Sequence, residues 1–141
     1  MEYRIHILLF RTAHLQENRL RPSLAKIGLS HGQPKVLRCL RQLGPCSQRT
    51  LAEYCEVDPA AICRMLDSME RNGLLLRQPS QTDRRTDEIR LTEKGSQALA
   101  QWEETCDAYE DQLLQGFSEE EKQQLQQFLA RAYRNVGGRL L

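Results

Sequence analysis

The stretch TLAEYCEVDPAAICRMLDSMERNG, residues 50–73, predicts two short helices joined by a tight turn. The first helix ends near Cys55. The second begins at Asp58-Pro59, because an aspartate at the N-cap accepts hydrogen bonds from free amides and proline fits the first helical position. Its apolar side chains recur at helical spacing, so we expect a helix over 58–72 with one buried face. Two short helices joined by so tight a turn are typical of a helix-turn-helix.

The residues that follow predict a β-hairpin with a long, charged tip. Residues 74–77 and 88–91 carry the apolar side chains expected of two paired strands. Residues 79–87 between them are polar and offer nothing to bury. A hairpin of this kind directly after a helix-turn-helix is a wing, which we place at 77–90.

Helical patterns flank this unit on both sides. Upstream, we expect a helix within residues 3–20, a connection marked by Pro22 and Gly28, and a helix at about 31–43. The last of these is opened by a capping box, Ser30-His31-Gly32-Gln33. Downstream, we expect long helices at 92–115 and 118–136. The predicted fold class is therefore mainly α with a small β-hairpin wing.

The terminal helices carry apolar stripes that are too broad for a small winged helix-turn-helix to cover alone. A second copy of the chain is the simplest cover, so these helices are expected to form a homodimer. We treat residues 1–141 as a single domain, with a DNA-binding lobe at 30–95. The helical dimerisation region comprises residues 1–20 and 96–141.

Composition and charge exclude several classes of protein. Hydrophobic residues make up 40% of the chain and charged residues 28%, which argues against disorder. No apolar run approaches the roughly 20 residues that span a bilayer, and we expect a cytoplasmic protein without a membrane partner. The net charge is +1, but residues 1–46 hold eight Lys or Arg and two acids, whereas residues 96–141 hold four and eight. A basic face could therefore exist despite the neutral total.

The cysteines and histidines do not follow the spacing of a metal site. The five cysteines form no CxxC pair and the three histidines are scattered, so neither zinc nor a disulfide framework is expected. The chain also lacks HExxH, P-loop, GxSxG and dinucleotide-binding motifs. We expect no cofactor, no metal and no enzymatic activity.

The helix-turn-helix and the wing suggest specific contacts to double-stranded DNA. The start of helix 58–72 would read the major groove, because small side chains allow close approach and an arginine can reach a guanine edge or a phosphate. The candidate residues there are Pro59, Ala60, Ala61, Cys63 and Arg64. Phosphate contacts are expected from Ser47, Arg49, Thr50 and Arg77. At the wing tip, Arg84 and Arg85 would approach DNA, with Arg85 in the minor groove and Asp83 orienting an arginine.

Three segments of this sequence resemble the MarR family of bacterial transcriptional regulators. They are GLSHGQPKVLRCL at 28–40, TLAEYCEVDPAAICRMLDSMERNGLLLRQPS at 50–80 and DRRTDEIRLTEKG at 83–95. The last segment fits the family's D-x-R…L-T-x-x-G signature through Asp83, Arg85, Leu91, Thr92 and Gly95. The family often has Ser-Thr and then Thr-Arg in the recognition helix, whereas this chain has Ala60-Ala61 and Cys63-Arg64.

The resemblance implies a homodimeric transcriptional regulator that binds a pseudo-palindromic operator. It favours a repressor over an activator. It also implies a small phenolic or lipophilic effector bound between the dimerisation helices and the DNA-binding lobe, at residues the sequence does not identify. Two alternatives remain open. One is a thiol-based redox sensor of the same fold, in which oxidation of Cys63 would add bulk and charge beside DNA. The other is a winged helix that docks proteins and does not bind DNA.

Overall fold

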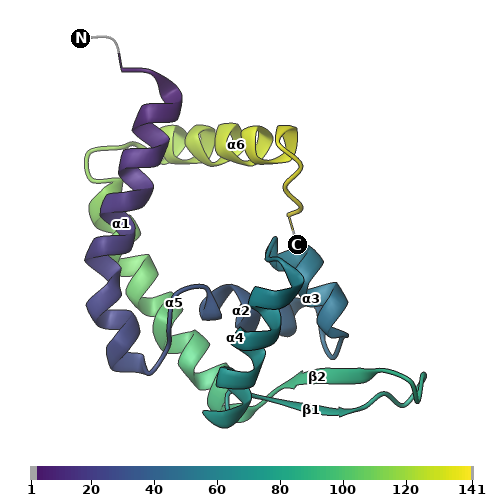
Figure 1. Cartoon of the computed structure of the whole chain (residues 1–141). Coiled ribbons are helices and arrows are strands. Elements are labelled where there is room, and N and C mark those ends of the chain that lie inside the picture. Colours follow the sequence, from purple (N-terminus) through teal and green to yellow (C-terminus); the bar gives the residue numbers. More distant parts are fainter. Residues whose placement is uncertain (1–2, 141) are drawn as a thin grey trace.

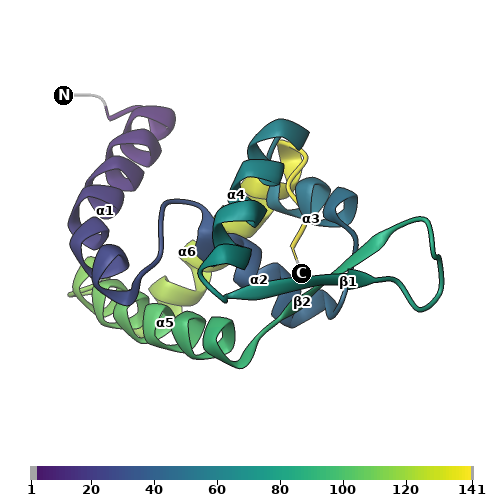
Figure 2. The ribbon, with the colours of Figure 1, turned by 60° about the horizontal axis from the view of Figure 1, so that its bottom comes forward.

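The computed structural model describes residues 3–140, which form a helical molecule with one β-hairpin (Figure 1). The elements in chain order are α1 Ile5–Ile27, α2 Gln33–Leu43, α3 Gln48–Cys55, α4 Pro59–Arg71, β1 Leu75–Pro79, β2 Asp87–Leu91, α5 Glu93–Leu113 and α6 Glu119–Asn135. Helices α2, α3 and α4 gather beside the hairpin, whereas α1 lies at the far end of the molecule and packs on α5 (Figures 1 and 2). The predicted fold class, a winged helix-turn-helix with terminal helices, is confirmed.

The hydrophobic core lies in the winged-helix lobe. Its fully buried side chains come from α2, α3, α4, both strands and the start of α5, for example Leu37, Leu51, Ile62, Ile89 and Leu99. Helix α6, in contrast, has no buried residue. The core therefore also takes in Leu24 of α1 and the start of α5, whereas α6 lies outside it.

Side-chain caps fix the helix boundaries where the sequence predicted them. The Asp58 carboxylate accepts hydrogen bonds from the backbone amides of Ala60 and Ala61, at 3.1 and 3.0 Å. Ser118 and Glu121 form the full reciprocal capping box at the start of α6. These caps satisfy amides that have no partner within the helix, and so define where each helix begins.

Two predicted boundaries are wrong. Helix α1 continues through Pro22 and ends at Ile27, with Gly28 in the left-handed conformation at φ 86°. Proline removes a single backbone bond there, and burial of Leu24 in the next turn holds the helix together. Helix α2 begins at Gln33, not at 31, and its N-cap Gly32 has no side chain to cap it. Only half of the expected box forms, because the Gln33 side chain accepts from the Ser30 amide at 3.0 Å.

The hairpin is shifted toward its tip relative to the predicted strands. Leu75 pairs with Leu91 and Pro79 with Asp87, so the ladder continues into residues expected to form the loop. Cys46, just before α3, adds a short bridge to Ile89 through two backbone hydrogen bonds of 2.8 and 3.3 Å. This bridge attaches the base of the wing to the helix-turn-helix.

The last residues of the chain return to the lobe. The Arg139 guanidinium donates to the Glu53 carboxylate of α3 at 2.6 Å and lies over the Tyr54 ring. Tyr133, near the end of α6, hydrogen bonds to Glu56. These contacts are polar and exposed, so they orient α6 more than they stabilise it.

Candidate nucleic-acid interface

The first turns of α4 present an open surface suited to a DNA groove. Pro59, Ala60, Cys63 and Arg64 are exposed and Ala61 is half-buried. The opposite side of the same helix is completely buried through its Ile62, Leu66 and Met69 side chains. Since the buried face fixes the helix on the lobe, the exposed face has a fixed orientation.

A shallow hollow lies between the start of α3 and the hairpin. It has a volume of about 340 Å³ and is lined by residues of both elements, among them Ser47, Arg49, Arg77 and Asp87. The Ser47 hydroxyl accepts from the Thr50 amide at 3.1 Å and contacts the Thr50 hydroxyl at 3.0 Å. Ser47 and Thr50 therefore serve as the cap of α3, and Arg49 is the exposed cation of the group.

Arg77 differs from the other predicted phosphate contacts, because α4 holds its side chain. Its Nη1 atom lies 2.7 Å from a carboxylate oxygen of Asp67 and 3.4 Å from one of Glu70. The side chain is only 22% exposed. Sequence reasoning did not find this arrangement, since the three residues are brought together only by the packing of β1 against α4.

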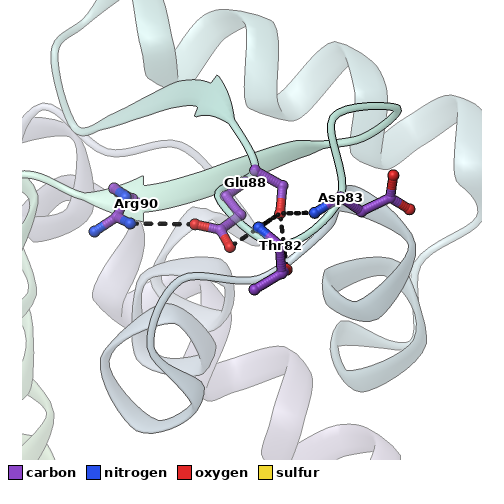
Figure 3. A network of polar contacts seen from close by, with 5 residues as sticks. Thr82, Asp83, Glu88 and Arg90 are labelled. Atoms are coloured by element: carbon purple, nitrogen blue, oxygen red, sulfur yellow. Dashed lines mark hydrogen bonds and ion pairs between the residues drawn. The ribbon is translucent and has the colours of Figure 1, made fainter.

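The wing is braced by a polar network that sequence reasoning missed (Figure 3). The buried Ser80 hydroxyl accepts from the amides of Thr82 and Asp83, at 3.3 and 3.2 Å, and lies 3.3 Å from the Glu88 carboxylate. Glu88 in turn accepts from Arg90 at 3.2 Å. The network ties the start of the tip loop to β2 and gives the wing a defined shape.

Asp83 acts on the backbone of the tip. Its carboxylate accepts from the Arg85 amide at 3.0 Å, so the contact between Asp83 and this arginine is made through the Arg85 main chain. Within residues 3–140, the guanidinium groups of Arg84 and Arg85 have no ion-pair partner in the chain, and both residues are exposed. The tip therefore offers two free cations.

The basic residues of the N-terminal segment do not join the wing face. Arg41 forms a two-point ion pair with Glu103 of α5, and Arg38 lies 3.5 Å from the same carboxylate. Lys35 donates to the Cys55 carbonyl at the end of α3. Helix α1 lies on the side of the molecule away from the hairpin (Figure 2). Arg38, Arg41 and Lys35 are thus engaged with α5 and α3.

The thiols occupy contrasting environments. Cys63 is exposed on α4, whereas Cys39 and Cys55 are buried with their Sγ atoms 3.5 Å apart. The hydrogen bond from the Cys55 thiol lowers the pKa of Cys39 to about 7, against the opposing effect of burial. The same bond, together with burial, raises the pKa of Cys55. No cluster of three potential metal ligands exists within residues 3–140.

A second cavity, of about 560 Å³, lies between α1, α2 and α5. Its walls are mainly apolar, with Leu20, Leu24, Leu29 and Pro34 beside Trp102, and Arg21, His31 and Lys35 supply polar groups. The sequence did not locate it, because its walls come from three separated segments. Helix α1 therefore forms one wall of this cavity.

Large apolar side chains are exposed along the terminal helices. Ile5 and Phe10 of α1 are 78% and 76% exposed, and Phe128 and Leu129 of α6 are also open to solvent. None of the helices described is both long and apolar enough to cross a membrane.

Three helices around a buried core, with the second and third joined by a tight turn and followed by a braced hairpin, define a winged helix-turn-helix protein. Residues 29–86 match the model of the MarR family. Over these residues, which run from just before α2 to the end of the wing tip, the chain resembles the MarR family of transcriptional regulators, and its fold is that of the transcriptional regulator SlyA.

Solved structures of several regulators share this fold over almost the whole chain. The transcriptional regulator SlyA is 25% identical with a TM-score of 0.83, and the match covers 95% of this chain and 94% of SlyA. S. aureus MepR, solved as a DNA complex, is 21% identical with a TM-score of 0.79, covering 94% and 96%. The organohalide-sensing regulator RdhR, solved with bound 2,4-dichlorophenol, is 22% identical with a TM-score of 0.79, covering 93% and 78%.

Proposed function

We propose that this protein is a homodimeric repressor whose DNA binding is released by a small aromatic effector. The observation that carries the proposal is the exposed first part of α4, held by its buried opposite face beside a wing with two unpaired arginines. The resemblance to MepR, which is solved with DNA, supports the same use of the lobe. The lobe would comprise residues 30–95.

In this proposal α4 enters the major groove and the hairpin reaches the adjacent minor groove. Ala60 and Ala61 allow close approach, while Cys63 and Arg64 face the bases or the backbone. Arg49 and the amides at the capped start of α3 bind phosphate. Arg84 and Arg85 supply positive charge to the minor groove, where narrow A·T tracts concentrate negative potential.

The exposed apolar stripes of α1 and α6 support a dimer of two copies of the chain. Soluble monomers rarely leave contiguous apolar patches of this kind in water. Burial against an identical surface would also place two lobes around one two-fold axis, which matches a pseudo-palindromic operator. Residues 1–20 and 96–141 would form this dimerisation region.

The cavity between α1, α2 and α5 supports an effector of mainly apolar, aromatic character. It is large enough for a substituted phenol, its walls are apolar, and RdhR is solved with 2,4-dichlorophenol. The cavity lies where the terminal helices meet the lobe, so an occupant would bias the position of the lobe. Such a ligand regulates only if it binds the DNA-competent and DNA-incompetent arrangements with different affinities.

The experiment that tests the proposal is selection of random-sequence duplexes by the purified protein at two salt concentrations. We expect a pseudo-palindrome with half-sites about one helical turn apart and an affinity that falls steeply with salt. If no motif emerges and binding stays weak at low salt, the lobe docks a protein partner instead. Trp102, the single tryptophan, lines the effector cavity, so its fluorescence reports titration with 2,4-dichlorophenol directly.

A thiol-sensing regulator is a second candidate, favoured by the exposed Cys63 on the face that would meet DNA. Hydrogen peroxide would oxidise this thiol to a sulfenic acid, with water as the other product. The added oxygen would lie between α4 and the groove. Loss of operator binding after peroxide treatment, absent in Cys63→Ser and reversed by a thiol reductant, would identify this mode of regulation.

A further inference from the structure

The acidic residues of α4 form a clasp with Arg77 of β1. Glu70 accepts from the Arg77 backbone amide at 2.9 Å through one oxygen and lies 3.4 Å from the Arg77 guanidinium through the other. Asp67, one helical turn earlier, accepts from the same Nη1 atom at 2.7 Å. Three polar contacts therefore join the second half of α4 to a single residue at the base of the wing.

The clasp connects the two elements that would enter separate grooves. Arg77 is paired in the ladder with Ile89, which is fully buried and bridged to Cys46. A rotation of the wing relative to α4 would have to break the Arg77 contacts. Simultaneous binding in a major and a minor groove requires a fixed angle between helix and wing. If this angle is already set in the free protein, less conformational entropy is lost when DNA binds.

We infer that Arg77 is a positioning residue that holds the wing at a set angle to α4 through Asp67 and Glu70, and that it is not a phosphate contact. This inference rests on the proposed DNA-binding function. It also accounts for the two carboxylates, Asp67 and Glu70, on a helix that is proposed to bind DNA. Their charge is directed to Arg77 at the wing base, away from the exposed first turns of the helix.

Neutralising an acid on a DNA-binding surface ordinarily strengthens binding to a polyanion. The clasp predicts the opposite for Glu70→Ala. We expect this variant and Arg77→Ala to bind the selected operator roughly tenfold more weakly than wild type, the equivalent of about 1.4 kcal/mol. The loss of affinity in the double variant should be smaller than the sum of the two single losses, because both single variants remove the contact between Glu70 and the Arg77 guanidinium.

Two further readouts separate positioning from direct contact. The slope of log affinity against log salt should be unchanged in Arg77→Ala, whereas loss of a phosphate contact would reduce it by about one. On a duplex too short to include the wing sites, the variants and wild type should bind equally. Arg71→Ala, which removes an exposed cation from α4, is the matched control for charge.

Tighter or unchanged operator binding by Glu70→Ala would overturn the inference, as would a reduced salt slope in Arg77→Ala. If wild type itself selects no operator, the proposed function fails, and amide hydrogen exchange then decides the inference alone. Glu70→Ala should exchange faster than wild type at Arg77 and Ile89, with α2 and α3 unaffected. Equal exchange at both positions would show that the clasp does not hold the wing.

Discussion

Arg41 and Glu103 face each other across α2 and α5 as a two-point ion pair, with both N–O distances at 2.6 Å. The pair joins the DNA-binding lobe to the long helix that leaves it. The planar guanidinium matches the two carboxylate oxygens, a geometry that makes such pairs stronger than single contacts. Its strength depends on the charge of Glu103, and therefore on pH.

The hydrogen bond from Arg41 lowers the pKa of Glu103. A carboxyl group whose pKa is lowered by folding stabilises the protein above its unfolded pKa, and this contribution is lost as the pH falls through the folded value. We therefore expect Glu103→Gln to lower the urea midpoint at pH 7 and to have little effect near pH 3. An equal effect of the substitution at both pH values would contradict this interpretation.

Gly95 lies against the backbone at the start of α5. A Cβ atom at this position would overlap the Leu74 carbonyl oxygen and lie 2.8 Å from a Leu91 methyl group. Because backbone cannot move aside as a side chain can, Gly95→Ala should destabilise the chain by about 2 kcal/mol or more in urea unfolding. Gln97→Ala, on the exposed side of the same helix, is the control and should change stability by less than about 1 kcal/mol.

Cys63 should react with iodoacetamide in the native protein, whereas Cys39 and Cys55 should react only after unfolding. The first thiol is exposed and the other two are buried in the lobe core. Peptide mass spectrometry over a time course measures the three rates. Fast native labelling of Cys39 would indicate that the lobe opens locally, because its lowered pKa makes access the limiting factor.

Arg64 and Arg85 should contribute to DNA recognition in different ways. If Arg64 contacts a base, Arg64→Ala should cost about 1–3 kcal/mol and relax the preference at one operator position. Arg85→Ala should weaken binding most at sites with A·T-rich flanks, since the narrow minor groove there attracts a cation. Binding of both variants to operators with altered centres and flanks distinguishes these effects. A uniform loss over all sequences would make Arg64 a phosphate contact.

The proposed dimer should depend on the exposed apolar side chains of α6. Phe128 is more than half exposed in the single chain, so Phe128→Glu should leave the lobe folded and convert the dimer to monomer, because a buried unpaired carboxylate is costly. Gln127→Glu makes the same charge change on the neighbouring exposed residue and should remain dimeric. Light scattering with circular dichroism measures both, and a dimeric, folded Phe128→Glu variant would place the interface elsewhere.

The local signals of the sequence predicted most of the fold. Asp58 caps α4 as expected, and Thr92 and Ser118 cap α5 and α6 where those helices were expected to begin, because capping involves residues only two or three positions apart. The boundaries at Pro22 and Gly32 were wrong, since packing of α1 on α5 outweighs a single lost bond and backbone geometry alone caps α2. The local conformational preference of a residue is overridden where tertiary packing contributes more to the free energy of folding.

The exposed surface of the candidate site could be predicted from the sequence, whereas the contacts between elements that hold this surface in place could not. The exposed face of α4 follows from helical periodicity, because the buried positions define the open ones. The partners of Arg77 and Ser80, and the cavity beside Trp102, depend on contacts between elements far apart in the chain. A single sequence carries no record of which charged or polar side chains meet across such distances.

The uneven distribution of the core, with α6 burying none of its residues, has a consequence for heating experiments. A unit with its own core melts at a temperature independent of how much protein is present, whereas helices that rely on a second copy follow mass action. In the proposed dimer, unfolding of α6 should therefore shift to higher temperature as the sample is concentrated, while the transition of the core stays in place. Calorimetry at two protein concentrations would separate the two thermal events within one short chain.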